Sequence, residues 1–387
     1  MIAKLQQELE RRMGPGETAA GFFAPGRVNL IGEYTDFNGG HVFPCALTIG
    51  TYGVARRRGD RRIRLYSLNF AEDGIYETSL DELIYRDIDG WSNYAKGVVW
   101  AFREKGYAIP AGFDFLCYGN IPNQSGLSSS ASLEVLVSKV LIELFGLPVE
   151  MVEAALISQY AENRFVGVNC GIMDQFAIAN GKQGHAVFLD TETMAYRHVP
   201  VRLDGVSIVI GNTKKKRGLH DSKYNERRRE CEQALQDLQQ VCRIRTLGDL
   251  TEAAFEEAAH VIHEENCRRR ARHAVYENQR TLQAVKALQE QDIATFGRLL
   301  NASHISLRDD FEVTGPELDA MVEAAWKQPG VLGARMTGAG FGGCTVNLVE
   351  TAAVPGFIEQ VGRMYEEAVG YPGEFYVVEI GDGPKRI

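Results

Sequence analysis

The placement of the glycines constrains the fold of this chain more than any other feature of its sequence. There are 40 glycines among 387 residues, which is about 10% against an average near 7%. The informative ones fall in four clusters, at Gly26–Gly40, at Gly126, at Gly167 with Gly171, and at Gly338–Gly343. Glycine lets the backbone approach a partner closely, and each cluster adjoins charged residues or a serine run. The fold is therefore expected to bring these loops against a ligand.

The charge balance excludes several classes of protein. Lys and Arg number 42 and Asp and Glu number 51, so the net charge is −9. A negative surface argues against a dedicated nucleic-acid or membrane-surface protein, and an anionic ligand would need a local binding device. Apolar residues make up 45% and charged residues 24%, as in an ordinary globular protein. No apolar run approaches the roughly 18 residues that a membrane span requires.

The cysteines and the N-terminal segment indicate a cytoplasmic protein. The seven cysteines are scattered, their number is odd and no Cys-x-x-Cys occurs, which argues against a disulfide framework or a zinc site. Lys4, Glu8 and Glu10 stand where a signal peptide needs an apolar core. The segment instead predicts a short amphipathic helix that ends at Gly14-Pro15-Gly16.

Hydrophobic periodicity predicts an α+β protein with two domains. Residues from Tyr224 to about Leu300 are strongly helical and charged, and the runs Arg227–Arg229 and Arg268–Arg270 are interpreted as solvated helix faces. The change from strand-rich to helix-rich sequence near 180–205 suggests domains at residues 1–180 and 181–387. The periodicity predicts strands at 41–56, 61–70, 112–118, 185–189, 196–201, 206–211, 343–349 and 374–380, and helices at 91–105, 130–145, 150–165, 316–327 and 355–369.

The first cluster, in APGRVNLIGEYTDFNGGHVFPCAL, packs three charges into ten residues. Arg27 is followed by Glu33 and Asp36, with Tyr34 between the two carboxylates. Carboxylates at this spacing can accept hydrogen bonds from several hydroxyl groups of a sugar. An ordinary polar turn is an equal alternative from spacing alone, because loops are rich in Asp, Asn and Gly.

The second cluster, PNQSGLSSSASLEV, places Gly126 and three serines, Ser128–Ser130, directly before a predicted helix. A helix N-terminus presents unpaired N–H groups and a partial positive charge, so it can bind an anion such as phosphate. A serine hydroxyl can also ligate Mg²⁺. The alternative is a helix cap, but one cap needs only one serine. No G-x-x-x-x-G-K-[ST] motif occurs here, so this is not a P-loop.

The remaining clusters carry weaker signals. Gly338–Gly343 formally contains G-x-G-x-x-G, but a strand follows where a dinucleotide-binding fold needs a helix. A loop that approaches phosphate or a facing domain is expected there, and a tight hairpin turn is the alternative. In AENRFVGVNCGIMDQF, Asp174 follows Glu162 by twelve residues and has apolar neighbours. Such a carboxylate needs a partner, for which Arg27 is the candidate, and a structural ion pair is the alternative.

Together these segments resemble the GHMP family of small-molecule kinases, from Ala24 to Val349. GRVNLIGEYTDFN is similar to the sugar-binding segment of the members that phosphorylate galactose, GLSSSA to the phosphate loop, and TGAGFGG to the third glycine motif. CGIMDQF is similar to the segment that carries the catalytic aspartate. The resemblance implies a two-domain α+β fold with mixed sheets and flanking helices, and an active site in the cleft between the domains.

The resemblance also implies roles for individual residues. Asp174 would be the catalytic base, and Arg27 would stabilise the transferred phosphoryl group. Ser130 and Glu162 would hold Mg²⁺. The implied sugar contacts are Glu33, Tyr34, Thr35, Asp36 and Tyr224, and the implied ATP contacts are Ser67, Trp91, Tyr94, Gln124, Ser125, Gly126, Leu127, Ser128, Ser129 and Ser130. At two positions the chain departs from the family, because Tyr34 replaces a usual His and Gln124 a usual Gly.

The activity implied by the resemblance is ATP-dependent phosphorylation of the C1 hydroxyl of α-D-galactose by a monomeric enzyme, with no nucleic acid or membrane as partner. One alternative is a kinase for a related sugar such as N-acetylgalactosamine. Another is a non-catalytic sensor that binds galactose and ATP. Sensor relatives are eroded in the serine segment, whereas Ser128-Ser129-Ser130-Ala131 is intact here.

Overall fold

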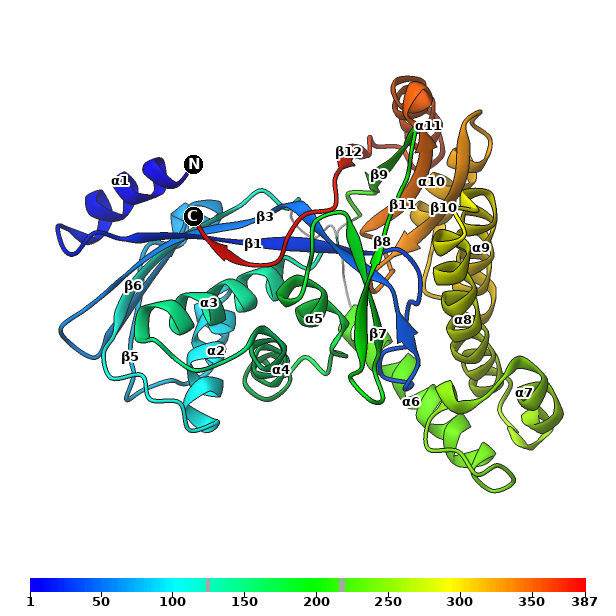
Figure 1. The fold of residues 1–387 in the computed structure, drawn as a ribbon, viewed down its shortest axis with the longest axis horizontal. Helices are drawn as coiled ribbons and strands as arrows, with labels where there is room; N and C mark the ends of the chain where they lie inside the picture. The colour runs from blue at the N-terminus through cyan, green and yellow to red at the C-terminus, as the bar shows by residue number, and fades with distance from the viewer. Residues whose placement is uncertain (123–125, 216–219) are drawn as a thin grey trace.

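Within the described residues, the fold consists of three β-sheets with helices packed against them (Figure 1). It is described by a computed structural model that covers residues 1–122, 126–215 and 220–387. Gln124 and Ser125, two of the predicted ATP contacts, lie outside the described residues. The α+β class and the flanking helices predicted from the sequence are confirmed.

The largest sheet has six strands in the order β13-β1-β3-β6-β4-β5. The β4 and β6 strands run parallel and the other neighbours run antiparallel, so the sheet is mixed, as expected. The C-terminal strand β13 pairs with β1, which brings the end of the chain back to its beginning (Figure 1). The strands are β1 (Ala20–Asn29), β3 (Pro44–Arg57), β4 (Arg62–Ser67), β5 (Tyr76–Ser79), β6 (Phe113–Gly119) and β13 (Lys385–Arg386).

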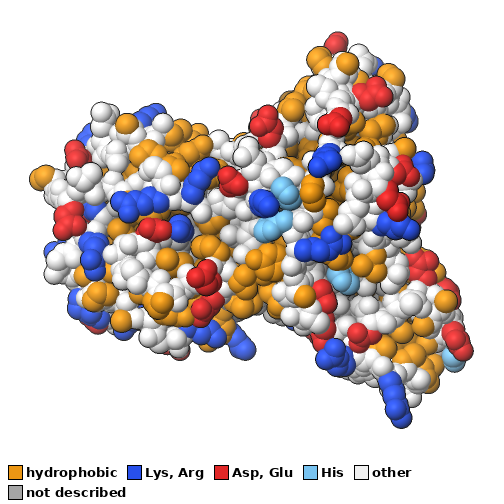
Figure 2. Space-filling view, viewed as in Figure 1, with side chains coloured by type: hydrophobic (Ala, Val, Ile, Leu, Met, Phe, Trp, Pro, Cys, Tyr) orange, Lys and Arg blue, Asp and Glu red, His pale blue; other side chains and the backbone are white. Residues whose placement is uncertain are grey.

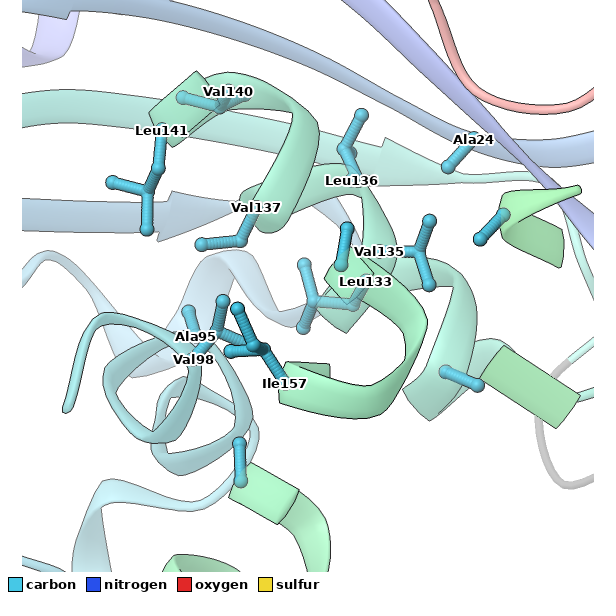
Figure 3. Packing of buried hydrophobic residues seen from close by; sticks show 14 of the residues in the cluster. Ala24, Ala95, Val98, Leu133, Val135, Leu136, Val137, Val140, Leu141 and Ile157 are labelled. Atoms are coloured by element: carbon cyan, nitrogen blue, oxygen red, sulfur yellow. The ribbon is translucent and has the colours of Figure 1, made fainter. Parts of the chain in front are cut away.

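Helices cover both faces of this sheet. On one face, α3 (Ser129–Phe145) lies between the sheet and the helices α2 (Ser92–Glu104) and α4 (Met151–Ala161), with α5 (Met173–Ala179) beside them. Because α3 has neighbours on several sides, it is apolar around most of its surface, and Leu133 to Leu141 interlock with residues of the sheet and of α2 and α4 (Figure 3). The amphipathic α1 (Ile2–Met13) packs on the opposite face through Leu5 and Leu9.

The second sheet has four antiparallel strands in the order β10-β11-β9-β12. Alternate residues of β9 point to opposite faces, so Val209 packs against α10 and α11 while Ile208 and Ile210 pack against α8 and α9. Val28 and Leu30, at and just beyond the end of β1, join the latter core and connect the two sheets. The elements are β9 (Val206–Asn212), β10 (Val331–Thr337), β11 (Cys344–Glu350), β12 (Glu374–Val378), α8 (Glu265–Gln289), α9 (Ile293–Ser306), α10 (Pro316–Trp326) and α11 (Val354–Val369).

A third, small sheet and a helical arm complete the fold. The small sheet has the order β2-β7-β8, with β2 (His41–Val42), β7 (His185–Asp190) and β8 (Tyr196–Pro200). The arm contains α6 (His220–Leu238) and α7 (Glu252–Ala258) and projects at the lower right of Figure 1. The short helical segments are η1 (Leu68–Asp73), η2 (Asp87–Asp89), η3 (Glu162–Val166), η4 (Leu247–Asp249), η5 (Ala259–Val261), η6 (Leu307–Phe311) and η7 (Thr351–Ala353).

The interpretation of the arginine runs as solvated faces is wrong for two members. Arg270 is only 1% exposed and pairs with Glu230 and Glu312, while Arg227 is 5% exposed and donates to the Phe311 carbonyl oxygen. These guanidinium groups fasten α6 and α8 to the turn after α9, because a buried charge needs partners. Arg227 and Arg270 therefore stabilise the packing of the helices and do not belong to a solvated face.

Basic and acidic side chains are interspersed on the face shown in Figure 2, without a broad patch of one sign there. Within the described part of the chain, no helix combines the length and the apolar character needed to cross a bilayer.

The domain boundary between residues 180 and 181 remains a prediction. Two strand pairs cross it, because β2 pairs with β7 and β13 pairs with β1.

Candidate active site

A cavity of about 240 Å³ lies where the four glycine clusters meet. Three loops border it: the acidic loop (Gly32–Gly40), the serine loop (Gly126–Ser130) and the glycine loop (Gly338–Gly343). Residues from both predicted domains contribute to its wall. The lining residues are Arg27, Glu33, Tyr34, Asp36, Gly126, Ser128, Ser129, Ser130, Glu162, Gly167, Val168, Asn169, Cys170, Gly171, Met173, Asp174, Tyr224, Asn225, Gly338 and Ala339.

Arg27 and Asp174 form a bidentate ion pair in the wall of the cavity. Arg27 Nε donates to Asp174 Oδ1 at 2.7 Å and Nη2 donates to Oδ2 at 2.8 Å. The Arg27 side chain is 4% exposed, whereas that of Asp174 is 32% exposed, so the carboxylate is the member of the pair that a ligand can reach. A register shift in β1 between Pro25 and Arg27 accompanies this placement, and such bulges often redirect a side chain beside an active site.

The serine loop adds further donors around the same carboxylate. Ser128 Oγ donates to Asp174 Oδ2 at 2.5 Å, and Arg27 Nη1 donates to the Gly126 carbonyl oxygen at 2.6 Å. Ser128 is the N-cap residue of α3, yet its side chain makes no capping hydrogen bond. Ser129 and Ser130 also line the cavity. The first N–H groups of this long helix, together with the hydroxyl groups of Ser129 and Ser130, can bind anionic oxygens.

Glu162 belongs to a second group of carboxyl groups at the cavity wall. It begins the π-helical turn η3 directly after α4, and π-bulges are frequent at functional sites. Gln175 Nε2 donates to Glu162 Oε2 at 2.6 Å and to Glu134 Oε2 at 2.9 Å. Burial, followed by repulsion from Asp174, raises the pKa of Glu162 to about 7, and burial raises the pKa of Glu134. A cation at this position would relieve the charge repulsion.

Asp36 lines the same cavity and lies against the segment that carries Asp174. Burial, followed by repulsion from Asp174 and Glu33, raises the pKa of Asp36 to about 6. Its carboxylate lies directly over Gly171, where a Cβ atom would be 1.7 Å from Asp36 Oδ2. Only glycine leaves room for the carboxylate there, which explains why this glycine cluster lies opposite the acidic loop.

Aromatic rings close the cavity beside the acidic loop. Tyr34 has a left-handed backbone conformation with φ of 65°, and its hydroxyl donates to the Ala339 carbonyl oxygen at 2.5 Å. Its ring lies 5.6 Å from that of Tyr224, centroid to centroid. Burial, followed by the charge of Asp36, raises the pKa of Tyr224 well above its usual value. Tyr224 therefore stays a neutral phenol that can donate a hydrogen bond.

The glycine loop connects two antiparallel strands, β10 and β11. The rejection of a dinucleotide-binding motif at this position is therefore confirmed, since no helix follows the glycines. The Gly338 N–H donates to Glu33 Oε1 at 2.8 Å, and a Cβ atom at Gly338 would lie 3.0 Å from the Gly126 carbonyl oxygen. The loop thus lies against both the acidic loop and the serine loop.

Five residues implied by the family resemblance do not line this cavity. Thr35 is fully buried, and its hydroxyl is close to the carbonyl oxygens of Gly32 and His41, so it shapes the acidic loop from within. The side chain of Leu127 lies in the core. Ser67 caps η1 by accepting from the Asn69 N–H, Trp91 lies at the N-terminus of α2 against Tyr76, and Tyr94 packs against the core. Their assignments as ligand contacts stay predictions.

The sequence did not indicate the residues that hold the acidic loop from behind. Glu277 of α8 accepts from the Gly32 N–H at 3.1 Å and from Ser303 Oγ at 2.6 Å, and His273 Nε2 donates to the Glu33 carbonyl oxygen at 3.1 Å. Burial opposes the charge of Glu277, but Arg280 and His273 outweigh it and lower its pKa to about 2. The available signal was the spacing of His273, Glu277 and Thr281, which places polar groups on one helix face among small apolar residues.

Comparisons with known proteins agree with this site. The description "GHMP kinases N terminal domain" matches residues 93–182, "GHMP kinases C terminal" matches residues 284–367, and "Galactokinase galactose-binding signature" matches residues 9–57. The chain is 58% identical over 366 residues to a galactokinase of Clostridium beijerinckii, covering 95% of this chain and 94% of the relative. It is 56% identical over 371 residues to a galactokinase of Ligilactobacillus salivarius, covering 96% of each.

Solved structures give the same result. The crystal structure of Lactococcus lactis galactokinase complexed with galactose has a TM-score of 0.98 and 50% identity, and the match covers all of both chains at 100%. Methanococcus jannaschii mevalonate kinase, with a TM-score of 0.65 and 17% identity, covers 95% of this chain and shows the same fold. The arginine–aspartate pair, the serine loop and the glycine loop thus occur in a chain that belongs to the galactokinases of the GHMP kinase family.

Proposed function

We propose that the chain transfers the γ-phosphoryl group of ATP to the C1 hydroxyl of α-D-galactose, giving galactose 1-phosphate and ADP. The observation that carries this proposal is the position of Asp174, whose carboxylate lies between the acidic loop and the serine loop and is held by Arg27 and Ser128. A hydroxyl-bearing ligand on one side and a phosphate on the other would meet at this carboxylate. The relatives named galactokinase and the galactose complex support galactose as the acceptor.

Asp174 would act as the general base of the transfer. It would accept the proton of the C1 hydroxyl while the sugar oxygen bonds to the γ-phosphorus and the bond from that phosphorus to the ADP oxygen breaks. Arg27 would offset negative charge on the phosphoryl oxygens, and its two bonds to Asp174 fix the direction of the carboxylate. Phosphoryl transfer depends mainly on such positioning and charge compensation.

Each substrate would occupy one side of the cavity. Glu33, Asp36 and the neutral phenol of Tyr224 would bind the sugar hydroxyls, because together they supply acceptors and a donor. Tyr34 lines the same side. On the other side, the N–H groups and hydroxyl groups of the serine loop would bind the ATP phosphates. The adenine is proposed to lie near Trp91 and Tyr94, as the family resemblance implies.

Ser130 and Glu162 fit a site for Mg²⁺ that accompanies ATP. Both line the cavity, and burial, followed by repulsion from Asp174, raises the pKa of the Glu162 carboxyl group. Among the described residues, no three His, Cys, Asp or Glu side chains are grouped as metal ligands. Mg²⁺ commonly takes only one or two carboxylates from the protein and its other ligands from phosphates and water. When bound, it would neutralise charge on the phosphates.

We also propose a cytoplasmic monomer. All seven cysteines are free thiols, which suits a reducing compartment.

Replacing Asp174 by Asn tests the proposed base. Asp174→Asn should bind galactose with an affinity within a few fold of the original in calorimetry. Its kcat should fall by about 10²–10⁴-fold, the usual contribution of a general base. The exposed Asp204→Asn serves as a matched control and should leave both quantities unchanged. Near-native kcat in Asp174→Asn would show that the base is another group.

A further inference from the structure

Glu33, which is proposed to contact the sugar, is held by residues of β10 and the glycine loop some 300 positions away in the sequence. Its Oε1 accepts from the Gly338 N–H at 2.8 Å and from Thr337 Oγ1 at 3.1 Å. Arg335 Nη2 forms an ion pair with the same oxygen at 2.9 Å. Three groups therefore converge on a single carboxylate oxygen.

Arg335 is itself fixed to the segment that leads into the acidic loop. Its Nη1 donates to the carbonyl oxygen of Asn29 at 2.7 Å and to that of Leu30 at 3.1 Å. The side chain is fully buried. A buried guanidinium needs a compensating charge, and Glu33 provides it through the ion pair. Arg335 thus ties β10 to both the backbone and the side chain of this segment.

These contacts leave the second carboxylate oxygen of Glu33 available. Glu33 lines the cavity, and no contact found within the described ranges 1–122, 126–215 and 220–387 falls on its Oε2. The backbone is held as well, because His273 donates to the Glu33 carbonyl oxygen. A glutamate that is free in solution loses considerable rotamer freedom when it is ordered. Here the Glu33 side chain is already ordered by the fold, so binding a ligand costs little further rotamer entropy.

We propose that Arg335 is a positioning residue for the sugar. By holding Oε1 of Glu33, together with Thr337 and Gly338, it directs Oε2 toward one hydroxyl group of galactose. Arg335 does not line the cavity, so its effect on the sugar would pass through Glu33. The inference rests on the proposed function, because it takes galactose to be the ligand beside Glu33.

The test compares galactose with its 2-, 3-, 4- and 6-deoxy derivatives in steady-state kinase assays. In the original protein, the deoxy sugar that lacks the partner of Glu33 should have a kcat/KM lower by at least about tenfold, as expected when a buried polar group loses its partner. Glu33→Gln should weaken this discrimination at one hydroxyl group and thereby identify it. Arg335→Lys keeps the charge but not the planar fork. It should weaken discrimination at that same hydroxyl group, raise the KM for galactose and leave the KM for ATP within about twofold.

Thr337→Val removes a single donor to Glu33 Oε1 with little change of side-chain volume. This variant is the second test, and it replaces Arg335→Lys if that protein does not fold. It should cause a smaller loss of discrimination at the same hydroxyl group. The exposed Arg363→Lys on α11 is the matched control and should change nothing. Unchanged discrimination, or an equal loss at every hydroxyl group, in the folded variants would overturn the inference. Failure of the original protein to phosphorylate galactose would instead overturn the proposed function.

Discussion

The surroundings of Asp36 disfavour the ionised form of its carboxyl group. Burial and the nearby carboxylates of Asp174 and Glu33 raise the pKa of Asp36 to about 6, against an ordinary value of 3.8. A carboxyl group whose pKa is raised in the folded state stabilises that state fully only below its unfolded pKa, and this stability is lost as the pH rises through about 6. At neutral pH the ionised Asp36 therefore lowers the stability of the protein, which is typical of groups kept for function.

Asp36→Asn should consequently make the protein more stable and less active. At pH 8 the free energy of unfolding should rise by up to about 3 kcal/mol, the value of a two-unit pKa shift. The gain should be smaller at pH 5, where the original carboxyl group is already largely protonated. Urea titrations of both proteins at the two pH values measure this difference, and the kcat/KM for galactose should fall sharply. A gain that does not depend on pH would contradict the assignment.

Gly171 provides a steric test of the same carboxylate. A Cβ atom at this position would lie 1.7 Å from Asp36 Oδ2, so Gly171→Ala must displace Asp36. We expect the KM for galactose to rise by about tenfold or more, as for the loss of a polar contact in a buried site. Gly356→Ala is the control, because its Cβ atom would meet no atom within 4 Å and Ala favours the helix α11. A galactose KM unaffected by Gly171→Ala would show that Asp36 does not contact the sugar.

The residues found from the sequence share one property, which is that each lies in a short segment with several unusual neighbours. Arg27, Glu33 and Asp36 lie within ten residues, and the serines adjoin a helix start. Glu277 and Arg335 reach the acidic loop only through the fold. The spacing of His273, Glu277 and Thr281 places Glu277 on a polar helix face but does not show what that face contacts, and nothing around Arg335 distinguishes it from an ordinary charge on a strand.

Among the secondary-structure elements, α8 has the clearest role in holding the site. Glu277 accepts hydrogen bonds from the N–H groups of Gly32 and Glu33, and Asn278 Oδ1 accepts from the His41 N–H at 2.8 Å. The pKa of Glu277, lowered to about 2, means that its contribution to stability is present above pH 4.5 and is lost as the pH falls toward 2. The helix thus supports the acidic loop at neutral pH.

Glu277→Gln should therefore weaken both the fold and sugar binding. The free energy of unfolding at pH 7 should fall by about 3 kcal/mol, the value of the pKa shift, because the charge of Arg280 loses its partner. The KM for galactose should rise several-fold while the KM for ATP stays the same. Glu290→Gln, an exposed change at the end of the same helix, is the control. Reduced stability with an unchanged galactose KM would show that α8 does not position the loop.

Several elements escaped prediction, among them the short strands β5 and β13, and three others have a clear physical reason. The β1 strand holds Gly21, Pro25 and Gly26 and is buried along most of its length, so it lacks the alternation of a half-exposed strand. The β10 strand contains Gly333 and the buried Arg335, which interrupt its apolar pattern. With seven residues, α5 is too short for a helical period to stand out. Periodic segments with clear ends, such as α3 between Ser129 and Gly146, were predicted closely.

For the whole molecule, the class was predictable but the way in which the sheets are joined was not. The alternation of strands and helices indicated an α+β protein, which the structure confirms. That β13 returns to β1, or that β2 pairs with β7, depends on contacts between distant segments. Because the net charge of −9 does not attract anions, the sequence indicated that a phosphate would need a local binding site. Arg27 and the serine loop line the cavity and are suitable groups for such a site.

The most direct test of the whole account is to map the product of the reaction. The protein is incubated with ATP, Mg²⁺ and galactose, and the phosphorus NMR spectrum of the product identifies the phosphorylated carbon, with N-acetylgalactosamine assayed in parallel. The account predicts stoichiometric ADP and a single sugar phosphate on C1 of galactose, with a higher kcat/KM for galactose than for the acetylated sugar. Phosphate on any other carbon, a preference for the acetylated sugar, or no ADP release would contradict it.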